Sequence, residues 1–69
     1  MYEAWLIEFK HQENGVPSYL SGLTSDFNEQ RTTDAWDALH FGRKQDAETI
    51  IRALGWTDVA ATATEHMFL

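Results

Sequence analysis

Apolar and polar residues alternate along the first ten positions of the chain, with the two-residue period of a β-strand. Trp5, Ile7 and Phe9 form the stronger apolar row, so the face that carries them is predicted to meet the core. We therefore expect a first strand over residues 2–11.

A tight turn and a second strand are predicted to follow. Asn14-Gly15 tolerates the positive φ angles that a two-residue hairpin turn needs. The return strand is expected over residues 16–20, where Pro17 lacks a backbone N–H and favours a position at the edge of the sheet. Residues 21–33 are rich in Ser, Thr, Asp and Asn and are expected to form an irregular connection.

Two helices are predicted in the second half of the chain. Thr33 can cap a short helix over residues 34–40, and Gly42 separates that helix from the next one. The second helix carries an apolar stripe with the spacing i, i+3, i+4 and i+7, and Gly55 suits a left-handed C-cap from which Trp56 packs back on the last turn. The stripe consists of Ala47, Ile50, Ile51 and Leu54.

A third strand over residues 59–69 completes the predicted elements, with polar and apolar residues mixed on both faces. The order β–β–α–α–β places the chain in the α+β class. The economical packing of these elements is a three-stranded antiparallel sheet with both helices on one face. A length of 69 residues provides for a single domain, residues 1–69.

The amino-acid composition limits the cellular compartments in which the protein is expected to work. The chain has no cysteine, which excludes disulfides and thiolate zinc sites and is compatible with a reducing cytoplasm. The sequence shows no signal peptide and no apolar run of the roughly 20 residues that a membrane span needs. We therefore expect a short complete reading frame whose product is cytoplasmic and has no membrane partner.

Sequence motifs for catalysis or metal binding are absent. The chain has no phosphate-binding glycine loop and no nucleophile elbow, and His11, His40 and His66 share no ligand spacing. Arg43-Lys44 is the single adjacent basic pair, which is too little for a nucleic-acid-binding stripe. We expect no enzyme activity, no cofactor, no metal and no direct binding of nucleic acid.

The remaining sequence feature that bears on function is the charge of the chain. It has 11 Asp and Glu and 5 Lys and Arg, which gives a net charge of −6. An acidic surface repels phosphate backbones and attracts basic protein surfaces, although acidity also keeps a small aromatic-rich protein soluble. If the hairpin, the connection and the first helix lie side by side, their acids form one negative face. The predicted partner-binding acids are Glu8, Glu13, Asp26, Glu29, Asp34 and Asp37, and the predicted aromatic contacts are Tyr19 and Phe27. For Phe27 the alternative is a loop residue inserted into the core.

Several segments carry a resemblance to known proteins. The Trp-Leu-Ile-Glu strand at residues 5–8, Tyr19-Leu20, Phe27 and residues 38–47 resemble short uncharacterised reading frames of phages and prophages. In size, acidity and lack of cysteine the chain also resembles anti-CRISPR proteins, many of which bind a Cas subunit and some of which mimic DNA. The resemblance covers most of the chain and implies no residue roles.

These observations predict a small acidic, non-enzymatic phage or mobile-element protein in the cytoplasm of the host bacterium. It would bind a basic nucleic-acid-binding protein of host defence, such as a Cas subunit, and block nucleic-acid access by mimicry. The alternative is a homodimeric phage structural or regulatory accessory protein, and a small hydrolase ranks last. A monomer and a homodimer both stay open.

Overall fold

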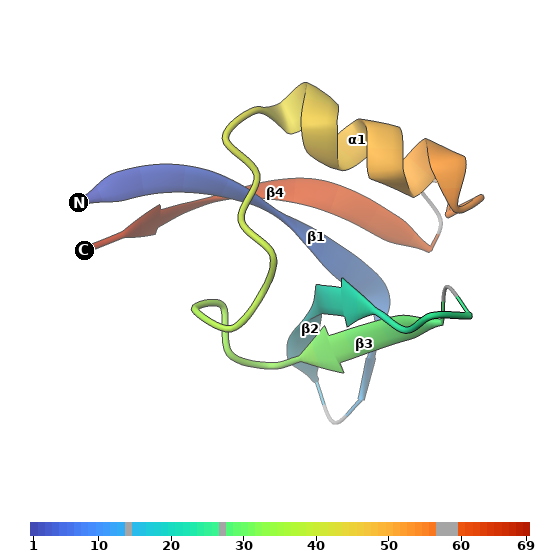
Figure 1. Cartoon of the computed structure of the whole chain (residues 1–69). Helices are drawn as coiled ribbons and strands as arrows, with labels where there is room; N and C mark the ends of the chain where they lie inside the picture. The colour runs from blue at the N-terminus through green and yellow to red at the C-terminus, as the bar shows by residue number, and fades with distance from the viewer. Residues whose placement is uncertain (14, 27, 57–59) are drawn as a thin grey trace.

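The chain folds into an antiparallel sheet of four strands with one helix packed on it (Figure 1). The computed structural model describes residues 1–13, 15–26, 28–56 and 60–69, and for residues 11–13 the backbone alone. The strands are β1 Tyr2–Glu13, β2 Val16–Leu23, β3 Glu29–Thr32 and β4 Ala61–Phe68, and the helix is α1 Lys44–Ala53. The order in the sheet is β3-β2-β1-β4, so β3 and β4 are its two edges.

The predicted three-stranded sheet with two helices is wrong, because the described part of the chain has four strands and one helix. The additional strand, β3, lies within the stretch that was predicted to be irregular. It pairs with β2 from Tyr19↔Thr32 to Leu23↔Glu29, and the ladder has an irregularity between Leu20 and Gly22. A polar segment can form such an edge strand because its neighbour supplies backbone hydrogen bonds independently of side-chain polarity.

The hairpin between β1 and β2 has the predicted turn. Gly15 has a φ of 73°, and Glu13 pairs with Val16 across the turn, while Asn14 lies outside the described residues. As a strand β2 lies between β3 and β1, but the edge position was predicted for Pro17 alone, and that prediction agrees with the ladder. Pro17 is tolerated there because the ladder to β3 begins at Tyr19, beyond Pro17.

The connecting segment, residues 33–43 between β3 and α1, takes the place of the predicted first helix. The Thr32 hydroxyl accepts a hydrogen bond from the Asp34 N–H (3.1 Å), and Asp34 Oδ1 accepts one from the Trp36 N–H (2.9 Å). The Asp37 N–H donates to Asp34 O (3.0 Å) and closes a single turn. Side chains that bond the local backbone compete with helix propagation, so Thr33 caps no helix here.

Beyond this turn the connecting segment becomes extended and pairs with the sheet. The Leu39 N–H donates to Leu20 O (2.9 Å). Trp5 and Phe41 then exchange two backbone hydrogen bonds, from Trp5 N–H to Phe41 O (2.7 Å) and from Phe41 N–H to Trp5 O (2.9 Å). A helix over residues 34–40 would use the Leu39 N–H within the helix and forfeit its bond to Leu20 O, which favours the extended segment over the predicted helix.

The C-terminus of α1 has the predicted cap. Gly55 has a φ of 73°, the Trp56 N–H donates to Ile51 O (2.9 Å), and the Gly55 N–H donates to Arg52 O (3.1 Å). This pair of bonds is a Schellman motif. Trp56 packs back on the core, with its ring edge-on to Phe9 at a centroid distance of 5.3 Å.

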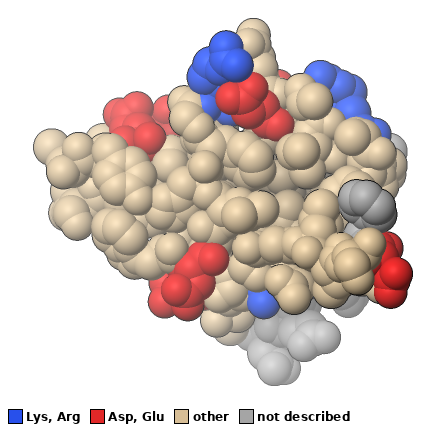
Figure 2. Space-filling model, viewed as in Figure 1, with Lys and Arg blue, Asp and Glu red and all other residues tan. Residues whose placement is uncertain are grey.

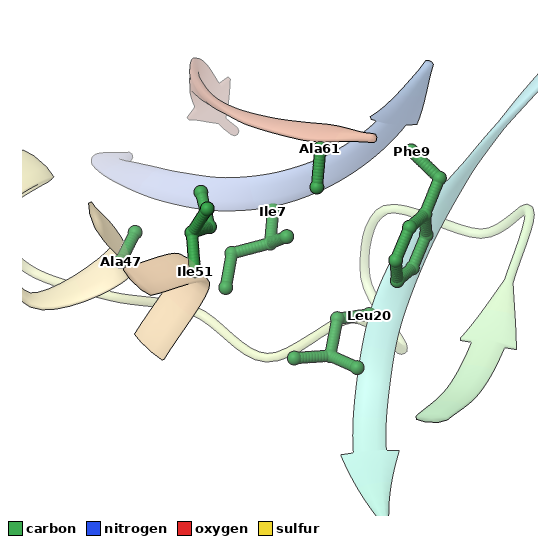
Figure 3. Close-up of a cluster of buried hydrophobic side chains, with 6 residues drawn as sticks. All are labelled: Ile7, Phe9, Leu20, Ala47, Ile51 and Ala61. Atoms are coloured by element: carbon green, nitrogen blue, oxygen red, sulfur yellow. The ribbon is translucent and has the colours of Figure 1, made fainter. Parts of the chain in front are cut away.

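A first hydrophobic cluster lies between α1 and the sheet, on the side that we call the helix face. In Figure 3 its side chains come from the helix and from the strands and point toward one another. The cluster consists of Ile7, Phe9, Leu20, Ala47, Ile51 and Ala61. The prediction that the row of Trp5, Ile7 and Phe9 meets the core is confirmed, with Trp5 partly buried at its margin.

A second cluster lies on the opposite side of the sheet, the turn face, and consists of Ala4, Leu6, Tyr19, Ala38 and Phe68. Leu6 is completely buried there. The connecting segment supplies Ala38 and the partly buried Ala35, so it covers the face of β1 opposite to the row of Trp5, Ile7 and Phe9.

The last strand agrees with its prediction in type, with bounds of Ala61–Phe68, while Val59 lies outside the described residues. The single helix of the described part has 10 residues, which is about half of what crosses a bilayer. Within the described residues, therefore, no helix could span a membrane.

Candidate protein-binding surface

Both termini lie at the same end of the molecule (Figure 1), and aromatic side chains of β1, β4 and the connecting segment contact one another there. We call Tyr2, Trp36, His40 and Phe68 the aromatic end. Phe68 is buried at its centre, with ring centroids 4.6 Å from Trp36, 5.3 Å from Tyr2 and 4.3 Å from His40. Trp36 and Tyr2 are 54% and 47% exposed. Two large rings therefore present apolar area to solvent on a packed support.

His40 ties this group together. Its Nε2 lies 3.0 Å from Ala35 O, and since a carbonyl only accepts, Nε2 carries the proton and donates. In the neutral ring Nδ1 then accepts from the Tyr2 hydroxyl at 2.7 Å. The imidazole thus holds β1 and the connecting segment in one arrangement.

Two carboxylates flank the exposed indole. Asp34 and Asp37 belong to the same turn as Trp36, both are exposed, and the bond from the Trp36 N–H positions the Asp34 carboxylate. The ion pairs found among the described residues join Arg31 to Glu29 and Arg43 to Asp46, so neither carboxylate of this turn is neutralised there. The aromatic end therefore has an acidic border.

The other predicted acids have different environments. Glu8 is half-buried on β1 opposite Tyr19, and Glu29 is ion-paired with Arg31. Asp26 is exposed between β2 and β3, whereas the Glu13 side chain and Phe27 lie outside the described residues. Figure 2 shows the acids on this face of the molecule as separate groups with uncharged surface between them. Asp34 and Asp37 are the pair that the structure unites in one turn, and the wider acidic face stays a prediction.

Tyr19 belongs to the core, with an exposed fraction of 7%. Its ring meets His66 edge-on at a centroid distance of 5.3 Å. Burial raises the pKa of the Tyr19 hydroxyl above its ordinary value, and the negative charge of Glu8 raises the pKa further. The predicted contact of Tyr19 with a partner stays a prediction.

Several basic side chains are engaged on the helix face. The Arg31 guanidinium lies 3.9 Å from the centroid of the Phe9 ring, and the Lys44 ammonium lies 5.5 Å from that of Trp5. Arg43 pairs with Asp46 at the start of α1. Positive charge is thus concentrated near the helix face, whereas Asp34 and Asp37 border the end of the turn face.

The sequence reasoning did not identify Trp36, Tyr2 or His40 as candidate binding residues. Its pattern placed Trp36 on the same face as Ala35 and Leu39 of a helix that does not form, and it treated Tyr2 as one position of a strand. A Trp between two Asp residues was the available signal, because a large apolar ring among charges suits a turn at the surface.

Possible metal ligands do not gather in the part of the chain that the structure describes. No group of three or more His, Asp and Glu side chains that could hold a metal ion occurs among the described residues. Comparison with known proteins adds no assignment, since the chain matches no protein-family model, no curated protein and no solved structure. The function is therefore argued from the surface.

Proposed function

We propose that this chain is a small non-enzymatic inhibitor that binds a basic surface of a nucleic-acid-binding protein through its aromatic end. The observation that carries the proposal is an exposed Trp36 supported by Phe68 and Tyr2 and flanked by the carboxylates of Asp34 and Asp37. Aromatic anchors near the centre of an interface commonly supply most of its binding energy.

The acidic border favours a cationic partner over a neutral one. An arginine of the partner can stack on the Trp36 indole while its guanidinium forms hydrogen bonds to a neighbouring carboxylate. The net charge of −6 adds long-range attraction, which speeds association and makes it sensitive to salt. The same charge disfavours nucleic acid itself as the partner.

The resemblance to phage and anti-CRISPR proteins supplies the biological setting of the proposal. A nucleic-acid-binding protein of host defence, such as a Cas subunit, has the required basic groove. The chain occupies that groove in the host cytoplasm, and its carboxylates take the place of phosphates. Target DNA is then excluded by competition.

Binding is tested with a panel of purified Cas effector complexes and labelled target DNA, read as DNA displacement. Trp36→Ala removes the anchor and is expected to weaken inhibition about 30-fold or more, as for an aromatic hot spot. The double variant Asp34→Asn/Asp37→Asn is expected to weaken it less and to flatten its salt dependence. Asn at position 34 keeps the side-chain oxygen that accepts from the Trp36 N–H.

Matched controls lie away from this end. Val16→Ala shortens an exposed apolar side chain at the hairpin, and Glu48→Gln removes a charge from α1. Both are expected to inhibit like the unmodified chain. Equal inhibition by Trp36→Ala, or no displacement by the unmodified chain from any complex of the panel, contradicts the proposal.

A further inference from the structure

His40 is the side chain of the aromatic end whose type changes charge near neutral pH. Its two ring nitrogens have different partners: Nε2 lies 3.0 Å from Ala35 O, and Nδ1 lies 2.7 Å from the Tyr2 hydroxyl. A carbonyl oxygen only accepts, whereas a hydroxyl either donates or accepts. The bond to Ala35 therefore keeps its direction in both charge states of the ring, and the bond to Tyr2 is the one that can reverse.

Protonation of the ring reverses the bond to Tyr2 without breaking it. The imidazolium has a proton on both nitrogens, so Nδ1, once it takes a proton from solvent, donates to the Tyr2 oxygen. The Tyr2 hydroxyl then turns its own hydrogen away from the ring. Both hydrogen bonds of His40 keep their heavy atoms in place, so the charge of the aromatic end changes while its packing is retained.

We propose that His40 is a pH-sensitive switch, and that its protonation weakens the binding of a cationic partner at the aromatic end. The imidazole is stacked on Phe68 at a centroid distance of 4.3 Å, and its centroid lies 6.3 Å from that of Trp36. Its positive charge therefore arises beside the indole on which an arginine of the partner stacks, and like charges at this separation repel. This regulation rests on the proposed function, because it acts on the same basic partner.

The titratable side chains around His40 come from the three elements that pack against it. They are Tyr2 on β1, Asp34 and Asp37 on the connecting segment, and His66 on β4. Glu3 and Glu65 lie on the helix face instead, because side chains alternate between the two faces of a strand. The two aspartates attract a cationic partner, and the charge of His40 offsets part of that attraction. His66, whose ring centroid lies 6.3 Å from that of Phe68, is a second histidine that a measurement has to separate from His40.

The binding test is the affinity of a labelled hexa-arginine peptide for the unmodified chain and for His40→Gln at pH 5.5, 6.5 and 7.5. The peptide keeps its charge over this range, and the glutamine amide does not titrate. Between pH 7.5 and pH 5.5, we expect the affinity of the unmodified chain to fall at least about threefold more than that of His40→Gln. His66→Gln, the matched control, should resemble the unmodified chain more closely than His40→Gln does.

Nuclear magnetic resonance of the free chain gives a second readout that needs neither a partner nor a variant. At pH 8 the nitrogen shifts of His40 should identify the tautomer with the proton on Nε2. As the pH falls, signals of the Tyr2 ring and the Trp36 indole should move with the same midpoint as those of His40, while the backbone amides keep the dispersion of a folded chain. A proton on Nδ1 at pH 8, or unfolding that accompanies the titration, overturns the switch.

The binding test has contradicting results of its own. Equal pH dependence of the unmodified chain and His40→Gln overturns the switch, and so does a peptide that neither protein binds at any pH. Displacement of DNA by the unmodified chain at neutral pH decides the proposed function separately. Displacement at neutral pH together with equal pH dependence would show that the aromatic end binds its partner without this regulation.

Discussion

Asp34 shows at the scale of one residue how a side chain redirects the backbone. Its carboxylate accepts from the Trp36 N–H and its own N–H donates to the Thr32 hydroxyl, so the chain makes one turn where a helix could have begun. The same bond keeps a charge next to an exposed indole. One residue thus determines both the local conformation and the chemistry of the candidate binding surface.

Tyr19 provides a prediction about pH at this scale. Its pKa is raised above 10.0 in the folded chain, chiefly by burial and also by Glu8, so the folded state holds the phenol proton at pH values where the unfolded chain has lost it. This contribution to stability is fully present below about pH 10 and is lost as the pH rises toward the folded pKa. The free energy of unfolding should therefore fall above pH 10, with a slope of at most about 1.4 kcal/mol per pH unit from this group.

The measurement is urea unfolding of the unmodified chain and of Tyr19→Phe between pH 7 and pH 11. Other groups titrate in both proteins, so the difference in their free energies of unfolding isolates Tyr19. It should stay constant up to about pH 10 and then shift in favour of Tyr19→Phe. A difference in the free energy of unfolding that stays constant from pH 7 to pH 11 would contradict the raised pKa of Tyr19.

At the scale of elements, α1 ends by local rules whereas the connecting segment follows tertiary ones. The Schellman motif at Gly55 needs only the helix and the two residues after it. The extended stretch at Phe41 needs β1, because its hydrogen bonds go to Trp5. An element whose hydrogen-bond partners are close in sequence can therefore be predicted from the sequence. An element whose partners are distant in sequence cannot.

Substitutions at two glycines test whether the end of α1 depends on its local backbone conformation. Gly55→Ala places a Cβ on a backbone with a φ of 73°, and although no atom lies within 4 Å of that Cβ, the left-handed conformation should cost about 1 kcal/mol of stability. Gly42→Ala, the control, also meets no atom within 4 Å and has no such φ, so it should be neutral or slightly stabilising. Chemical denaturation measures both, and equal effects would contradict the role of Gly55.

At the scale of the whole molecule, β1 is the central element because both of its faces are buried. Ile7 and Phe9 contact the cluster under α1, and Leu6 lies in the cluster under the connecting segment. A chain of 69 residues has little volume for a core, and two thin layers around one strand use it well. The connecting segment is thus part of the core although it has no regular secondary structure.

Leu6→Ala tests whether the second layer supports the fold. Leu6 is 0% exposed, so its truncation should cost about 2–5 kcal/mol, comparable with the roughly 3–5 kcal/mol that a domain of this size has in total. Circular dichroism should show a largely unfolded chain at 25 °C. Leu69→Ala, at a position that is 89% exposed, should melt like the unmodified chain. Retention of the full melting temperature by Leu6→Ala would show that the turn face is peripheral.

The sequence predicted the negative charge of the candidate binding surface but not the arrangement of its residues. Asp34 and Asp37 were identified from their sign alone, and the structure places them beside an exposed Trp36. Trp36 could not be found by periodicity, since its spacing from Ala35 and Leu39 fits the buried face of a helix. Trp36 faces solvent because the Asp34 side chain forms a turn in place of a helix and because the chain that follows pairs with Trp5.

By itself, the sequence determined the elements whose signals are local: the strand through Ile7, the Gly15 turn, and α1 with its cap at Gly55. It also determined the net charge of −6. The tertiary structure decided the rest, namely β3, the extended connecting segment and the burial of Leu6. These features depend on hydrogen bonds and contacts between residues far apart in the chain, and no local pattern of polarity encodes which distant strand a segment will meet.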